Sequence, residues 1–190
     1  MKELAVVLAV VAWLPIATQT TPADAAVLAE RLNADILASA SATLTLEAWC
    51  RDHKMADDPK ISAPLVAGAP KAPTGEQLQR LQVGATSAVK YRRVELRCGN
   101  HLFAEADNWY VPGRLTPEMN RLLETSDTPF GRVVQPLRPY RRTFASVRLW
   151  SFPSDTLFEH RAVLYTSDDE PFSEVDETYK AALLNVPLSR

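Results

Sequence analysis

The feature that most constrains the fold is a pair of strand-like runs in the middle of the chain. Residues 89–98 and 102–111 alternate apolar and polar side chains with a period of two, and they meet at Gly99-Asn100. Glycine and asparagine readily take the positive φ angles that a tight hairpin turn needs. Pro112-Gly113 follows and ends the second run. The sequence therefore predicts an antiparallel hairpin.

Helical patterns come before this hairpin. Apolar residues recur at helical spacing over residues 26–40, and a second helix capped by Thr43 or Thr45 extends to about Met55. Residues 61–66 form a short strand candidate, and residues 76–81 fit one or two helical turns. The order of these elements predicts two N-terminal helices that precede the sheet.

Further strands follow the hairpin, with one helix between them. Thr116 is suited to cap a helix over Pro117 to Glu124, because proline is favoured at the first helical position. Four more strand candidates are Val133-Val134, Thr143–Trp150, Phe158–Tyr165 and Phe172–Lys180. Helices followed by a meander of strands predict an α+β fold, with an antiparallel sheet of about six strands, two N-terminal helices and one inserted helix.

The N-terminal segment is typical of an export signal. Residues 4–17 are apolar almost throughout, Lys2 precedes them, and Ala23-Asp24-Ala25 supplies a small-x-small cleavage pattern. The apolar run is shorter than the roughly 20 residues that span a bilayer. We expect a signal peptide over residues 1–25 and one domain over 26–190, periplasmic or secreted, without stable membrane insertion. If the segment is not cleaved, the protein is cytoplasmic.

Composition excludes several classes of function. The net charge of −2 does not suit nucleic acid, which usually binds a strongly basic domain. No metal-ligand spacing is present, so we expect neither metal nor cofactor, and we expect a monomer. Cys50 and Cys98 are the two cysteines. They either pair in an oxidising compartment or act as two buried thiols, and the sequence leaves both alternatives open.

The alternation of the last strand separates its acids. Glu177 lies between Val175 and Tyr179 on the face expected to be covered, whereas Glu174 and Asp176 fall on the face expected to be solvated. A buried carboxylate must find a cation or take up a proton. Glu177 is therefore the candidate acid. The alternatives are an ion pair without catalytic duty and an exposed edge strand.

Arg93 is the expected cationic partner of Glu177. It shares a strand face with Val89 and Tyr91, and a guanidinium binds a carboxylate in bidentate fashion. The alternative is a cross-strand charge pair with Glu105 or Asp107.

Other arginines are expected to have simpler roles. Arg92 and Arg97 fit cross-strand charge pairs on the hairpin. We expect a basic cluster to be exposed on the surface, formed by Arg138, Arg141 and Arg142. One of these arginines could steer an anion into the pocket.

Three motifs resemble the chorismate lyase family, whose wider fold group includes the ligand-binding UTRA domains of bacterial regulators. They are Arg93-x-x-Leu96-x-Cys98, Thr128-Pro129-Phe130-Gly131-Arg132 and Asp176-Glu177-Thr178-Tyr179. The resemblance implies that Arg93 holds a ligand carboxylate and that backbone N–H groups at Phe130 and Gly131 contact the ligand. It also implies an acid on the opposite side of the ligand. This acid is Glu177 if the match to the family motif is shifted by one residue relative to Pro171, and Asp176 if it is not. Trp49 or Cys50 stands where the family has a pocket methionine.

Three functional hypotheses follow. The first, which the resemblance implies, is a carbon–oxygen lyase that uses Arg93 and Glu177 to eliminate pyruvate from chorismate or a similar cyclic enol ether, giving 4-hydroxybenzoate. The second is an exported, non-catalytic module that binds a small anionic aromatic or cyclic carboxylate. The third is a structural domain that kept the fold and lost the pocket. The arginine and the acid favour the first two, and the export signal favours the second over the first.

Overall fold

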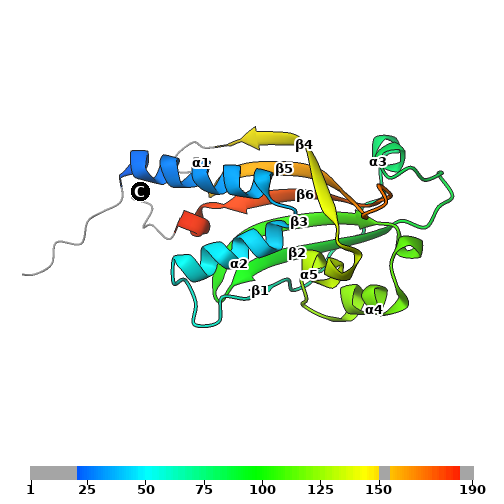
Figure 1. Ribbon diagram of the computed structural model, residues 1–190, viewed down its shortest axis with the longest axis horizontal. Helices are drawn as coiled ribbons and strands as arrows, with labels where there is room; N and C mark the ends of the chain where they lie inside the picture. Colours follow the sequence, from blue (N-terminus) through cyan, green and yellow to red (C-terminus); the bar gives the residue numbers. More distant parts are fainter. Residues whose placement is uncertain (1–20, 150–154, 185–190) are drawn as a thin grey trace, which may run out of the picture.

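The architecture is one twisted antiparallel sheet with helices packed on it (Figure 1). The computed structural model describes residues 21–149 and 155–184. Six strands pair in the order β1-β2-β3-β6-β5-β4. They are β1 (Ile61–Ser62), β2 (Lys90–Cys98), β3 (His101–Tyr110), β4 (Tyr140–Arg148), β5 (Thr156–Tyr165) and β6 (Pro171–Lys180). The predicted α+β class and the antiparallel sheet are confirmed.

The central hairpin forms where the sequence predicts it. β2 and β3 pair antiparallel, with Arg92 opposite Asn108 and Val94 opposite Ala106. Gly99 takes a φ of +52° in the turn, a conformation that glycine adopts without the steric cost of a Cβ atom. This hairpin provides two of the strands that border the cavity described below.

The predicted meander is wrong in one respect, because β3 pairs with β6 and not with β4. The chain between β3 and β4 contains α4 (Pro117–Thr125) and α5 (Phe130–Val133), which carry it away from the β3 edge. β4 then pairs with β5 at the far edge of the sheet. As a result β6, which carries Glu177, lies in the middle of the sheet.

Helices α1 (Pro22–Ala38) and α2 (Ala42–Asp52) cover one face of the sheet (Figure 1). Thr21 and Asp24 form a capping box that starts α1. Ser41 caps α2, and not Thr43 or Thr45 as predicted, because the helix begins earlier than its apolar pattern indicates. Between these helices and the sheet lies an apolar core that includes Leu32, Ile36, Leu46, Phe103, Phe158 and Tyr179.

The predicted signal peptide lies mostly outside the described residues. Its apolar run, residues 4–17, cannot be compared with the structure, whereas Ala23-Asp24-Ala25 belongs to the first turn of α1. Ala25 is buried in the core. Cleavage after Ala25 would therefore remove the first turn of this helix. None of the helices in residues 21–149 and 155–184 combines the length and the apolar character needed to cross a bilayer.

Helix α3 (Gly75–Arg80) is fastened to β6 by an ion pair. Arg80 donates to both carboxylate oxygens of Glu174, each at 2.8 Å, and the Glu174 side chain is almost fully buried. The prediction of a solvated Glu174 is wrong, because the sequence did not show that α3 would cover this end of the strand. Asp176 on the same strand face is half-buried.

The segment after β3 is helical. A short 3-10 helix, η1 (Pro112–Arg114), precedes α4, and Thr116 caps α4 as predicted. The predicted strand at Val133-Val134 is wrong: Val133 ends α5, and η2 (Gln135–Leu137) follows it. Both valines pack with aromatic residues in a second apolar cluster, so their burial comes from helical packing and not from a strand. A last 3-10 helix, η3 (Ala181–Leu184), ends the described chain.

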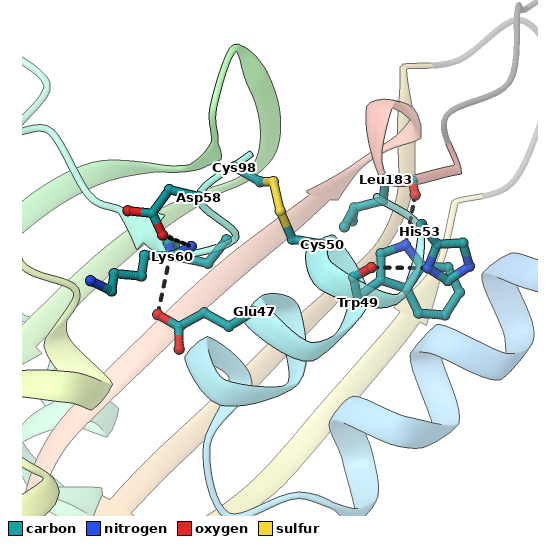
Figure 2. The surroundings of a disulfide bond; sticks show 9 residues. Glu47, Trp49, Cys50, His53, Asp58, Lys60, Cys98 and Leu183 are labelled. Atoms are coloured by element: carbon teal, nitrogen blue, oxygen red, sulfur yellow. Dashed lines mark hydrogen bonds between the residues drawn. A yellow bond between two sulfur atoms is a disulfide. The ribbon is translucent and has the colours of Figure 1, made fainter. Parts of the chain in front are cut away.

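A disulfide joins Cys50 of α2 to Cys98 at the end of β2 (Figure 2). The Cα atoms lie 6.3 Å apart, and both residues are fully buried. Of the two alternatives that the sequence left open, the structure has the paired cysteines. The bond fixes α2 to the strand that forms part of the cavity floor.

Replacing both cysteines, as Cys50→Ala/Cys98→Ala, is expected to lower the free energy of unfolding by roughly 2–4 kcal/mol. The bond closes a loop with a sequence separation of 48 residues, and a crosslink of this length restricts the unfolded chain strongly. Urea denaturation followed by circular dichroism measures the change. Equal stability of the oxidised wild type and the double variant would contradict a stabilising role for the bond.

Candidate functional site

A cavity lies between the sheet and the first turn of α2. The space inside it that the centre of a water molecule can occupy is about 50 Å³. Its floor comes from β2, β3 and β6, where the small side chain of Ala106 leaves space, and its roof comes from α2 and α5. Its lining includes Thr43, Arg92, Asn108, Gly131, Arg141 and Glu177. The cavity therefore brings three cationic or acidic side chains and one amide into a largely apolar enclosure.

Arg92 is a buried cation on the cavity floor, with 4% of its surface exposed. Its Nη2 donates to the backbone carbonyl oxygens of Ala63 at 3.3 Å, Ser126 at 3.3 Å and Thr128 at 3.1 Å. Nε and Nη1 are buried, and neither has a hydrogen-bond partner among the described residues. The loops around Arg92 thus hold its guanidinium in place and leave part of its donor capacity unused.

The charge of Arg92 is not balanced by a direct ion pair. No carboxylate of residues 21–149 or 155–184 forms a salt bridge with it; the sixteen bridges found involve other residues. Burial lowers the pKa of Arg92 to about 10, so the guanidinium remains protonated at neutral pH. The charge of Asp127 acts on Arg92 without a salt bridge, and a desolvated cation that lacks a direct ion pair is costly. An anion in the cavity would relieve this cost.

Glu177 lies on the floor with its carboxylate held by two donors. Arg141 Nη2 donates to Oε2 at 2.9 Å, and the Tyr179 hydroxyl donates to the same oxygen at 2.8 Å. The Arg141 and Glu177 side chains are both almost fully buried. Burial, and then the charge of Glu177, raise the pKa of Tyr179 well above its usual value, so the phenol stays protonated and donates. The carboxylate is thereby fixed as a hydrogen-bond acceptor.

Asn108 faces the cavity beside Arg92. It is 3% exposed, and neither its Nδ2 nor its Oδ1 has a partner within the described part of the chain. Arg92 lies directly opposite on β2, and Val175 lies opposite on β6. Buried side-chain amides are normally hydrogen-bonded in folded proteins. The amide of Asn108 therefore leaves one donor group and one acceptor unused beside this cavity.

The roof is tight where α5 meets α2. A Cβ atom on Gly131 would lie 2.8 Å from Thr43 Oγ1 and 3.1 Å from Ser41 Oγ, so only glycine allows this approach. Arg132 and Glu47 form an ion pair that joins the same two helices. The first N–H groups of a helix have no partner within it, and the first turn of α2 borders the cavity.

Three of the predicted site residues border the cavity. Phe130, Gly131 and Glu177 are among its walls. Asp176, which the sequence left as an alternative to Glu177, points to the other face of β6 and lies 3.7 Å from Arg161. Alternation along the strand thus selected the acid that faces the cavity, whereas its role remains a prediction.

Arg93 does not meet Glu177, and this part of the prediction is corrected. The Arg93 side chain lies on the opposite face of the sheet, is 39% exposed, and has Glu105 at 3.8 Å, which is the cross-strand alternative. The cation that meets Glu177 is Arg141, and the β2 arginine that borders the cavity is Arg92. The physical reason is alternation: Val94, Leu96 and Cys98 point into the core, so the neighbour with the same parity is Arg92.

Trp49 and Cys50 lie outside the cavity. Trp49 donates from Nε1 to the Leu183 carbonyl oxygen at 2.8 Å and stacks on His53, and Cys50 is in the disulfide (Figure 2). The first turn of α2, and not its middle, covers the cavity. Residues Ala42 and Thr43 therefore take the place expected for Trp49 and Cys50.

Sequence reasoning missed Arg92, Asn108 and Arg141 as cavity residues. Arg92 and Asn108 share the parity of the buried residues of their strands, a signal that was present in the sequence. Arg141 was expected to be exposed, although one arginine of its cluster was considered as an anion-steering residue. It is buried beside Glu177 instead, and its strand offers no clear apolar alternation that would have shown this.

Comparison with known proteins gives one clear relative. No protein-family model matches the chain. The uncharacterized protein y4mC of Sinorhizobium fredii (strain NBRC 101917 / NGR234) is 39% identical over 191 residues, which cover 90% of this chain and 81% of that protein.

Similar solved structures share the fold at low sequence identity. PhnF from Mycobacterium smegmatis matches with a TM-score of 0.54 and 12% identity, over 76% of this chain and 65% of PhnF. The effector domain of PhnF matches with a TM-score of 0.52 and 13% identity, over 74% of this chain and 88% of that domain. These likenesses show that the chain shares the α+β fold of these two structures.

His160 is a buried neutral side chain next to the acid. It is opposite Glu177 in the β5–β6 register, and its Nε2 lies 2.7 Å from Asn33 Oδ1 of α1. Burial lowers the pKa of His160 to about 4, an effect that the charge of Glu177 opposes and that of Arg141 reinforces. The unfolded chain protonates histidine near pH 6.5. Between these values the unfolded state binds more protons, so the free energy of unfolding decreases as the pH falls.

His160→Gln is expected to remove about 2–3 kcal/mol of the stability difference between pH 7 and pH 4.5. Glutamine does not titrate, and its amide can still donate to Asn33. Urea denaturation of both proteins at the two pH values measures the effect. If both lose stability equally on acidification, another group is responsible.

Proposed function

We propose that this chain, which belongs to the family of the Sinorhizobium fredii protein y4mC, binds a small anionic molecule in the cavity beneath α2 and α5. The observation that carries the proposal is Arg92: its charge is buried, it has no ion pair within the described ranges, and two of its nitrogens lack partners. An anion bound at Arg92 satisfies both the charge and the open donors. The shared fold with the effector domain of PhnF supports a binding role.

The cavity walls limit what the ligand can be. Val94, Leu96, Leu164 and Val175 provide apolar walls, whereas the polar groups are few. A site of this kind suits a ligand with an apolar body and a small number of polar ends. A compact aromatic or cyclic carboxylate meets this description, with its carboxylate at Arg92.

Glu177 favours binding over turnover. Its Oε2 accepts hydrogen bonds from Arg141 and Tyr179, which orient the carboxylate as an acceptor. A ligand with a hydroxyl or N–H group at that end can donate to Glu177. A general acid, in contrast, must carry a proton that it can give away. The arrangement therefore provides recognition of a donor more directly than it provides acid catalysis.

The proposal includes export of the protein from the cytoplasm. The apolar N-terminal segment is typical of a signal peptide, and the Cys50–Cys98 disulfide supports an oxidising compartment such as the periplasm or the cell exterior. Chorismate is made in the cytoplasm, so an exported protein would seldom meet it. Both considerations favour ligand binding.

Arg92→Leu is expected to weaken binding of 4-hydroxybenzoate about 10- to 100-fold, because a charged hydrogen-bond partner is lost. Arg92→Lys keeps the charge and should lose less. Arg93→Leu, on the opposite face, is the matched control and should bind like the wild type. Isothermal titration calorimetry gives the Kd values. An equal loss in Arg92→Leu and Arg93→Leu, or no binding by the wild type, would contradict the site.

Elimination of pyruvate from chorismate is the second candidate function. It is favoured by the arrangement of an arginine and a glutamate on one apolar cavity floor, with Arg92 in the position that the sequence predicted for Arg93. Aromatisation of the ring would supply much of the driving force. The protein would contribute orientation and electrostatic stabilisation.

We expect chorismate to remain unchanged when incubated with the purified protein, while 4-hydroxybenzoate binds. Liquid chromatography of the mixture detects the product, with a protein-free sample to correct for spontaneous breakdown. Formation of 4-hydroxybenzoate by the wild type but not by Glu177→Gln would establish the lyase and replace the binding proposal.

A further inference from the structure

Asn108 is a buried polar group of the cavity with no part in the proposed anion binding. Both ends of its amide are buried and unpaired among the described residues, although Arg92 is directly opposite with free nitrogens of its own. On its other side the register partner is Val175, which offers no polar side chain. A buried amide in this state is suited to a ligand group that both donates and accepts hydrogen bonds.

We propose that Asn108 determines ligand specificity by binding a neutral hydroxyl or carboxamide group placed next to the anionic group of the ligand. This inference rests on the proposed binding function. A second carboxylate would pair only with the amide NH₂ and would leave Oδ1 unsatisfied. A hydroxyl can accept from Nδ2 and donate to Oδ1, so it uses both ends of the amide.

The sheet register places this group close to the anion. Residues directly opposite in an antiparallel pair have Cα atoms about 4.5–5.5 Å apart, and Arg92 and Asn108 are such a pair. Groups bound by neighbouring side chains must lie on the same or adjacent atoms of a small ligand. The ligand class is therefore a 2-hydroxy carboxylate, or its amide analogue, with an apolar body.

Glu177 would contact a different part of the ligand. Asn108 pairs with Val175, and Glu177 is two residues further along β6, opposite Ala106. With strands about 4.8 Å apart and a rise of about 3.4 Å per residue, its Cα lies roughly 12 Å from that of Arg92. A donor at the far end of the ligand would reach Glu177, whereas Asn108 contacts the end that carries the anion.

Matched ligand pairs test this inference. The pairs are phenylacetate with mandelate, and benzoate with 2-hydroxybenzoate, where the second member adds a hydroxyl next to the carboxylate. We expect the wild type to bind the hydroxylated member about 5- to 10-fold more tightly, as one or two neutral hydrogen bonds would give. Isothermal titration calorimetry on the full chain measures each Kd.

Asn108→Leu supplies the decisive comparison. Leucine has the same branched arrangement of heavy atoms and is apolar, so the variant should lose the preference for the hydroxylated partners. Arg93→Leu, on the other face of the sheet, should retain the preference. Thermal unfolding of each variant shows whether the fold is preserved.

The outcomes separate the two proposals. If the wild type binds both members of each pair equally, or if Asn108→Leu keeps the preference, the role of Asn108 is wrong and the binding function stands. If the wild type binds none of these four anions and no 4-hydroxybenzoate, the binding function itself fails.

Discussion

The constraint on which this structure depends is the buried guanidinium of Arg92. Three backbone carbonyl oxygens, from Ala63, Ser126 and Thr128, hold one of its nitrogens, and these residues come from segments far apart in the chain. The loops before β2 and after α4 are therefore organised around a positive charge. Carbonyl dipoles stabilise this charge in part, but they do not neutralise it. Apolar side chains that filled the space beside Arg92 would bury the guanidinium further, at an additional cost of desolvation.

Much of the fold could be predicted because local signals were strong. The Gly99-Asn100 turn and the Thr116 cap are where the sequence placed them. The pairing of β3 with β6 could not be predicted, since strand order depends on how far α4 and α5 carry the chain, which periodicity does not contain. The predicted strand at Val133-Val134 is wrong for another reason. Two adjacent valines favour a strand, but their burial against the second apolar cluster decides for a helix.

The candidate site was predictable on one strand and not on another. On β6 a single apolar set flanked Glu177, and alternation selected it correctly as the acid that faces the cavity. On β2 the interpretation of Arg93 relied on Val89 and Tyr91 at the start of the strand, whereas Val94, Leu96 and Cys98 show the buried face. These three residues are the better guide to the buried face of β2, and Arg92 is the arginine that lies on the same face. The resemblance to a family motif favoured the wrong neighbour, because a shift by one residue reverses the face of the sheet.

The disulfide explains how a cavity with so few polar groups can be preformed. Cys50 lies two turns beyond the cavity-lining turn of α2, and Cys98 lies six residues beyond Arg92 on β2. The bond therefore ties the roof to the floor, and the close approach of Gly131 to Thr43 holds the second roof helix against the first. A ligand that enters does not have to order these elements. Since ordering them would reduce the affinity, the covalent link and the tight helix contact favour binding of a molecule too small to provide that free energy by its own contacts.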